Sequence, residues 1–106
     1  MYAGAIEDAN SGKILAQNLG KCPVAVLANH GVIVTGPTPA AVVYRAASFD
    51  RQCRLAYDVL STGRRPRPVP PSTRKAMHDT LVERAIDVYW SGAVRQTLKA
   101  HRDVVD

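Results

Sequence analysis

The sequence predicts an α/β domain that this chain contains only in part. Two short apolar runs of strand length are separated by a polar turn, and longer stretches with helical spacing flank them on both sides. The 106 residues suffice for one small domain with one hydrophobic core. A single hairpin is only marginally stable in water, however. We therefore expect the missing strands to come from another segment or another chain.

The N-terminal part contains one short helix and the two strands. Asn10 or Ser11 can cap the helix, and Gly20 follows its last residue, Leu19. The strands are predicted at 24–28 and 32–35, where continuous apolar residues are typical of strands covered on both faces. Asn29, His30 and Gly31 form the turn between them.

A long helix begins after Gly36-Pro37, with Thr38 as its N-cap and Pro39 at its first position. One apolar stripe runs along it to Gly63 and places Cys53 in the core. Residues 64–71 read RRPRPVPP, which predicts an extended connector. A second long helix is then capped by Ser72, and Gly92 breaks or kinks it. Three parts follow from this organisation: 1–63, 64–71 and 72–106.

Composition restricts the classes of function. The net charge of +5 suits an anionic ligand without requiring one. Two cysteines that fit no zinc or redox motif, together with the lack of a signal-peptide pattern, indicate a reducing compartment, and we expect a cytoplasmic protein. No apolar run approaches the length that spans a bilayer, so no membrane partner is expected.

His30 is the strongest candidate for chemistry. It lies in a tight turn at the end of a predicted strand, where an imidazole can project from a rigid support and bind a divalent metal ion such as zinc. Gly31 beside it allows close backbone approach. The alternative is that Asn29-His30-Gly31 is only a hairpin turn, since Asn and Gly tolerate positive φ. His78 and His101 lie in the C-terminal helical part and are expected on the solvated surface.

The block from 24 to 60 carries a family resemblance. It reads VAVLANHGVIVTGPTPAAVVYRAASFDRQCRLAYDVL, in which an apolar strand, an Asn-His-Gly turn, a second strand ending at Gly and a long helix follow one another. This block resembles the C-terminal half of the class II aldolase and adducin family. The resemblance implies a three-layer α/β/α fold with a mostly antiparallel sheet flanked by helices, of which this chain holds only a part.

The same resemblance implies a function. Family members include sugar-phosphate aldolases, epimerases, dehydratases and decarboxylases, which form tetramers and bind a divalent metal, usually zinc. The metal acts as a Lewis acid that stabilises an enediolate during aldol cleavage or decarboxylation. His30 matches the last metal-ligating histidine of the family, with Asn29 and Gly31 lining the site.

The chain also departs from the family pattern. The other metal ligands form a His-X-His pair in the family, and neither this pair nor the accompanying catalytic acid occurs here. We therefore expect the C-terminal part of a metal-dependent lyase, inactive alone, whose complete form is a homo-oligomer acting on a sugar phosphate or a hydroxy or keto acid. The alternative is a non-catalytic structural or protein-interaction module of the adducin type.

The connector concentrates positive charge. Arg64, Arg65 and Arg67 are candidates for binding phosphate or carboxylate, because guanidinium groups pair with such anions in a bidentate manner. A solvated connector is the alternative interpretation. Nucleic-acid binding is not expected, since the aromatic residues lie on the helices and do not alternate with the basic run.

Overall fold

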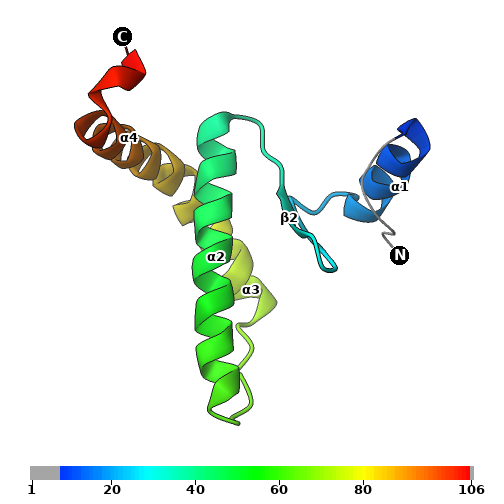
Figure 1. The fold of residues 1–106 in the computed structure, drawn as a ribbon. Helices are drawn as coiled ribbons and strands as arrows, with labels where there is room; N and C mark the ends of the chain where they lie inside the picture. The colour runs from blue at the N-terminus through cyan, green and yellow to red at the C-terminus, as the bar shows by residue number, and fades with distance from the viewer. Residues whose placement is uncertain (1–7, 106) are drawn as a thin grey trace. The chain divides into compact units, whose positions relative to one another are not determined.

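The computed structural model describes the backbone of residues 8–105 and the side chains of these residues apart from 80, 81, 83 and 105. The chain divides into two compact units, with the boundary between Pro37 and Thr38. The described residues form helices and one antiparallel pair of strands (Figure 1), which confirms the predicted α/β class. The helices and strands, in order, are α1 Ala9–Leu19, β1 Val24–Leu27, β2 Gly31–Val34, α2 Pro39–Ser61, α3 Pro71–Met77, the π-helical turn η1 His78–Val82, α4 Glu83–Ala100 and the 3-10 turn η2 Arg102–Val105.

The first unit begins with α1. Its N-cap is Asp8, whose carboxylate accepts a hydrogen bond from the backbone N–H of Ser11 at 2.7 Å. The predicted caps Asn10 and Ser11 were therefore wrong, because the carboxylate upstream already satisfies one of the free N–H groups of the first turn. Gly20 ends the helix as predicted, with φ at 55°.

The two strands form a hairpin with the register Val24↔Val34, Ala25↔Ile33, Val26↔Val32 and Leu27↔Gly31. The two strands are thus confirmed. The first ends one residue earlier than predicted, at Leu27, and the second is shifted by one residue toward the N-terminus, to 31–34. Within the described part of the chain, no third strand joins this sheet. The outer edge of each strand is consequently open among these residues.

One face of the hairpin exposes apolar side chains. Side chains of paired residues point to the same face, so Val26 and Val32 lie side by side there. Val26 is 70% exposed and Val32 is 47% exposed. The sequence predicted strands covered on both faces, and the described residues leave this face largely uncovered.

The second unit begins with α2, whose N-terminus forms as predicted. Thr38 is the N-cap, and its Oγ1 accepts a hydrogen bond from the backbone N–H of Ala41 at 3.1 Å. Pro39 occupies the first turn, where its missing N–H costs nothing. Ala41 is 2% exposed, and among the side chains that the structure describes it is the one that is buried.

The C-terminal half of α2 is exposed. Leu55 is 53% exposed and Leu60 is 59% exposed. Cys53, placed in a core stripe by the sequence pattern, is exposed as well. That prediction was wrong for this chain, because helical spacing identifies an apolar stripe but does not supply the surface that covers it.

The helices after the connector differ from the prediction in two details. The cap of α3 is Pro70, which makes no side-chain capping bond, and Ser72 lies inside the first turn. Pro71 therefore starts the helix, since its φ suits the first helical position. Helix α4 runs through Gly92 without a break, and the interruption of the helical stretch is η1. Of the connector predicted at 64–71, residues 64–70 contain neither helix nor strand, whereas Pro71 already belongs to α3.

Helices α2 and α4 contact each other within the second unit. The rings of Tyr44 and Tyr89 meet edge to face, with 5.7 Å between their centroids and 70° between their planes. Such a pair contributes about 0.5–1.5 kcal/mol beyond the area that it buries. This contact therefore helps to fix α4 against the N-terminal half of α2.

Candidate functional site

The hairpin turn positions His30. Its backbone N–H donates a hydrogen bond to the carbonyl of Leu27 at 3.1 Å, which closes the turn across Ala28 and Asn29. Asn29 has φ at 59°, a left-handed conformation that Asn adopts more readily than most residues. The turn is thus 28–30, and Gly31, predicted within it, is already paired with Leu27 as the first residue of β2.

The imidazole of His30 lies at an exposed tip. The residue itself is exposed, and so are its neighbours Asn29 and Gly31. Gly31 has φ at 135°, which residues with a side chain rarely adopt. A rigid turn between paired strands therefore presents His30 at the end of the sheet, where a ligand from another polypeptide segment can reach it.

The described residues do not complete a metal site around His30. Zinc sites in proteins use three or four protein ligands. Among the residues that the structure describes, no three His, Cys, Asp or Glu side chains gather in a group that could hold a metal ion. His78 and His101 are exposed, as predicted, and lie in the other unit.

A groove of about 380 Å³ lies between α1 and β1 in the first unit. Its walls are mainly apolar and include Ile14, Leu15 and Leu19 from the helix and Ala25 and Leu27 from the strand. His30 does not line it. The groove therefore marks incomplete packing of the helix on the sheet, and we assign no substrate to it.

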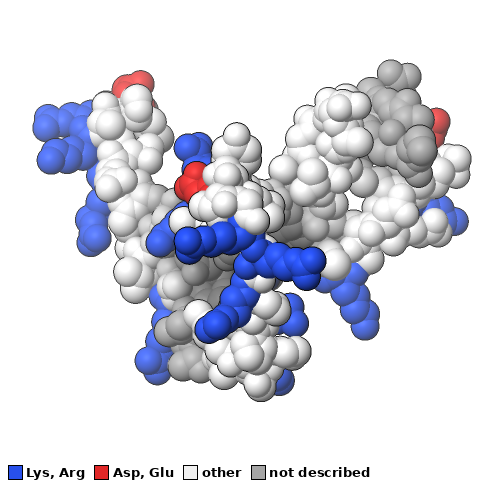
Figure 2. Space-filling view, turned by 90° about the horizontal axis from the view of Figure 1, so that it is seen from below, with Lys and Arg blue, Asp and Glu red and all other residues white. Residues whose placement is uncertain are grey.

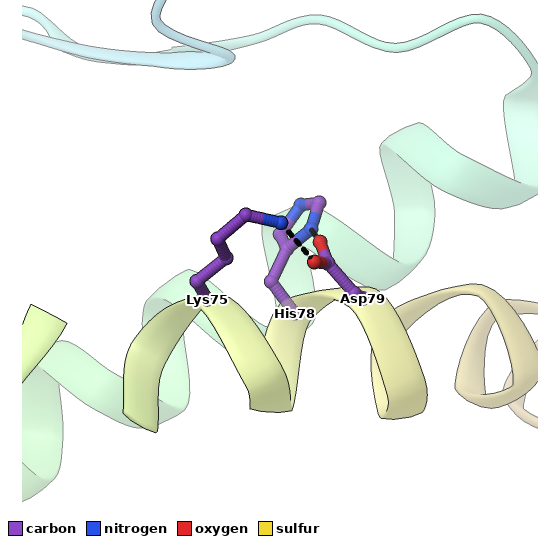
Figure 3. A network of polar contacts seen from close by, with 3 residues as sticks. All are labelled: Lys75, His78 and Asp79. Atoms are coloured by element: carbon purple, nitrogen blue, oxygen red, sulfur yellow. Dashed lines mark hydrogen bonds and ion pairs between the residues drawn. The ribbon is translucent and has the colours of Figure 1, made fainter. Parts of the chain in front are cut away.

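A polar network on α3 and η1 was not foreseen from the sequence. Lys75 forms an ion pair with Asp79 one turn later, and Nδ1 of His78 lies 3.4 Å from Oδ1 of Asp79 (Figure 3). The hydrogen bond from Lys75, followed by the one from His78, lowers the pKa of the Asp79 carboxyl. The spacing of four residues between Lys75 and Asp79 was the available signal. All three side chains are largely exposed, so the network stabilises the helix locally and forms no pocket.

The ion pair of Lys75 distinguishes this lysine from the arginines of the connector. Lys75 is partly neutralised by Asp79, whereas the structure shows no ion pair to Arg64, Arg65 or Arg67 among the described residues. All three arginines are exposed on the connector. Lysine and arginine side chains are far more extensive than acidic ones on the face seen in Figure 2. The connector therefore carries three exposed arginines within four residues, with no acidic partner among the described residues.

A comparison with known protein families shows which family this chain is related to. The class II aldolase and adducin N-terminal domain matches residues 2–57, more than half of the chain. The chain belongs to the class II aldolase and adducin family. Searches of curated proteins and of solved structures returned no significant match. No described helix has the length and apolar character needed to cross a membrane.

The part of the chain that matches the class II aldolase and adducin family includes the candidate metal ligand. It extends over the described α1, β1 and β2 and through most of α2, and it ends at Tyr57. His30 and its turn therefore lie inside the family domain. The connector and the helices α3 and α4 lie beyond the matched residues.

Proposed function

We propose that this chain forms part of a class II aldolase-like, metal-dependent lyase, in which His30 is one ligand of a divalent cation, most simply Zn²⁺. The observation that carries the proposal is the exposed imidazole at the tip of a closed turn, inside the residues that match the family. A neutral imidazole is a common zinc ligand. Asn29 and Gly31 would line the site as its neighbours in the chain.

The residues present do not hold the ion by themselves. One imidazole leaves at least two positions to be filled by other protein ligands, and the described residues supply no cluster that would fill them. The remaining ligands must therefore come from outside the described part of this chain. We accordingly assign no catalytic step to the chain alone.

Exposed apolar side chains support the proposal that another polypeptide segment completes the domain. The exposed valines of the hairpin and the exposed leucines of α2 lie on surfaces that a complete α/β domain would cover. We propose a homo-oligomer, tetrameric when complete, that acts on a small sugar phosphate or a hydroxy or keto acid. The two free cysteines, Cys22 and Cys53, fit a reducing compartment such as the cytoplasm.

A second candidate is a non-catalytic structural or interaction module of the adducin type. The lack of any metal-binding group among the described residues favours it. In that case the fold persists without a cation, and His30 serves only as a turn residue. The two candidates therefore differ in a single measurable property, which is the dependence of metal content on His30.

The test is metal analysis of the assembled protein. The chain, tagged at its C-terminus, is expressed in its source cells, purified with the polypeptides that associate with it, and analysed by mass spectrometry for zinc and other divalent metals. We expect about one ion per chain. We expect His30→Ala to lose it and His78→Ala, a matched exposed histidine, to retain it. A metal-free assembly would favour the adducin-type candidate, and a bound metal whose content does not change in His30→Ala would contradict the assignment of His30 as a ligand.

A further inference from the structure

We infer that the connector is a polyproline II ligand for a protein domain with an aromatic groove and an acidic rim, such as an SH3-type domain. The connector comprises residues 64–71, reads RRPRPVPP, and lies beyond the residues that match the family. The inference is independent of the metal site. It depends on the spacing of prolines and arginines, on their exposure and on the backbone conformation.

The backbone of the connector suits this form of recognition. No residue from 64 to 70 belongs to a helix or strand, and Pro70 has φ at −55° and ψ at 144°, close to the polyproline II conformation. Four prolines in eight residues restrict φ throughout the segment. The connector is also held at both ends, by α2 and by α3. Ordering the connector on binding would therefore cost little conformational entropy.

The side chains sort into distinct edges when the segment has three residues per turn. Arg65, Pro68 and Pro71 fall on one edge, and Pro66 and Val69 fall on the next. These two edges form an apolar strip that ends in one arginine. The remaining edge carries Arg64 and Arg67, together with Pro70.

This division matches what an aromatic groove requires. Proline-rich segments place apolar residues from two edges of the polyproline II helix against aromatic side chains of the partner. Pro71 is compatible with this pose although it begins α3, because proline fixes nearly the same φ in both conformations. Arg65 then reaches a carboxylate at the rim of the groove, where a bidentate pair can form.

Every position of the strip is accessible. All residues from 64 to 71 are exposed, and Val69, an apolar residue, is 49% exposed. No ion pair to Arg65 occurs among the described residues, so its guanidinium can pair with a partner without breaking one. Binding by charge alone would involve Arg64 and Arg65 equally, whereas binding in an aromatic groove requires Arg65 more than Arg64.

The experiment is an NMR titration of a ¹⁵N-labelled SH3 domain that selects Arg-x-x-Pro-x-x-Pro ligands with the purified full-length chain. We expect resonances of the aromatic groove to shift with saturable binding. Pro68→Ala and Arg65→Gln should each weaken binding by about tenfold, since both remove a central contact. Arg64→Gln has the same net charge as Arg65→Gln and should weaken binding by less than about twofold.

Two outcomes would overturn the inference. The first is the absence of groove shifts with the wild-type chain. The second is an equal loss for Arg64→Gln and Arg65→Gln with no effect of Pro68→Ala, which would indicate binding by charge alone. A parallel titration with a single-stranded oligonucleotide and with phosphatidylserine vesicles tests that case, and strong binding to either with this equal loss contradicts the groove model. Metal content of the Arg65→Gln assembly separates this inference from the proposed function, because it should not change.

Discussion

Two hydroxyl residues near the starts of α2 and α3 provide a sharp test of the structure. The sequence pattern makes Thr38 and Ser72 equivalent caps, but only Thr38 makes the capping hydrogen bond, to the N–H of Ala41 at 3.1 Å. We expect Thr38→Ala to reduce the free energy of unfolding by about 1 kcal/mol. We expect Ser72→Ala to change it by less than about 0.5 kcal/mol, as is usual for a surface substitution.

The magnitude follows from the position of the cap. The hydrogen bond is partly buried and ends at Ala41, the one buried side chain that the structure describes, so the loss should not fall at the lower end of the range for caps. For a unit of this size, 1 kcal/mol lowers Tm by about 4–8 °C. In urea it moves the midpoint by roughly 0.5 M.

The assay is thermal and urea unfolding of the full-length chain, followed by circular dichroism at 222 nm. Both variants keep the net charge and remove one hydroxyl group from a helix start, so they control for each other. Equal midpoints for Thr38→Ala and the wild type would refute the assignment of the cap. A loss in Ser72→Ala as large as that in Thr38→Ala would refute the boundary of α3.

Three further predictions concern the remaining contacts. The hydrogen bond from the backbone N–H of Ser11 lowers the pKa of the Asp8 carboxyl. The stabilisation of α1 by this cap should therefore be present above the carboxyl pKa of the unfolded chain and lost as pH falls through the lower pKa of the folded chain. Acid titration followed by circular dichroism should show this loss, and an acid titration curve of Asp8→Asn identical to that of the wild type would contradict it. Gly31→Ala should destabilise the hairpin by about 1 kcal/mol because φ is 135° there, and an unchanged amide-exchange rate across the strands would be the opposing result. A double-mutant cycle on Tyr44 and Tyr89 should give a coupling of about 0.5–1.5 kcal/mol in urea unfolding, whereas additive losses would mean that α4 does not pack there in solution.

Local rules predicted most of the elements. Apolar runs of β-branched residues located both strands, and the Thr38-Pro39 pair located the start of α2, because these signals act over a few neighbouring residues. The same rules did not identify which of several neighbouring residues caps or starts a helix. Asp8 was overlooked as a cap because it precedes two residues that also cap well, and Ser72 was chosen over the Pro70-Pro71 start.

Burial could not be predicted from the same pattern. The stripe on α2 correctly marks an apolar face, but exposure of Cys53 and Leu60 depends on which surface packs there. The candidate site has the same limit. His30 could be located in its turn from Asn29 and Gly31, yet the ligands that would join it are not determined by the residues around it.

The central claim is that His30 is a ligand of the metal ion, and X-ray absorption at the zinc edge tests it most directly. The measurement compares the assembled protein purified from its source cells with its His30→Ala variant. We predict an imidazole shell at about 2.0–2.1 Å from zinc in the wild type, with one imidazole fewer or no bound zinc in His30→Ala. An identical shell in both proteins would contradict the assignment of His30 as a ligand.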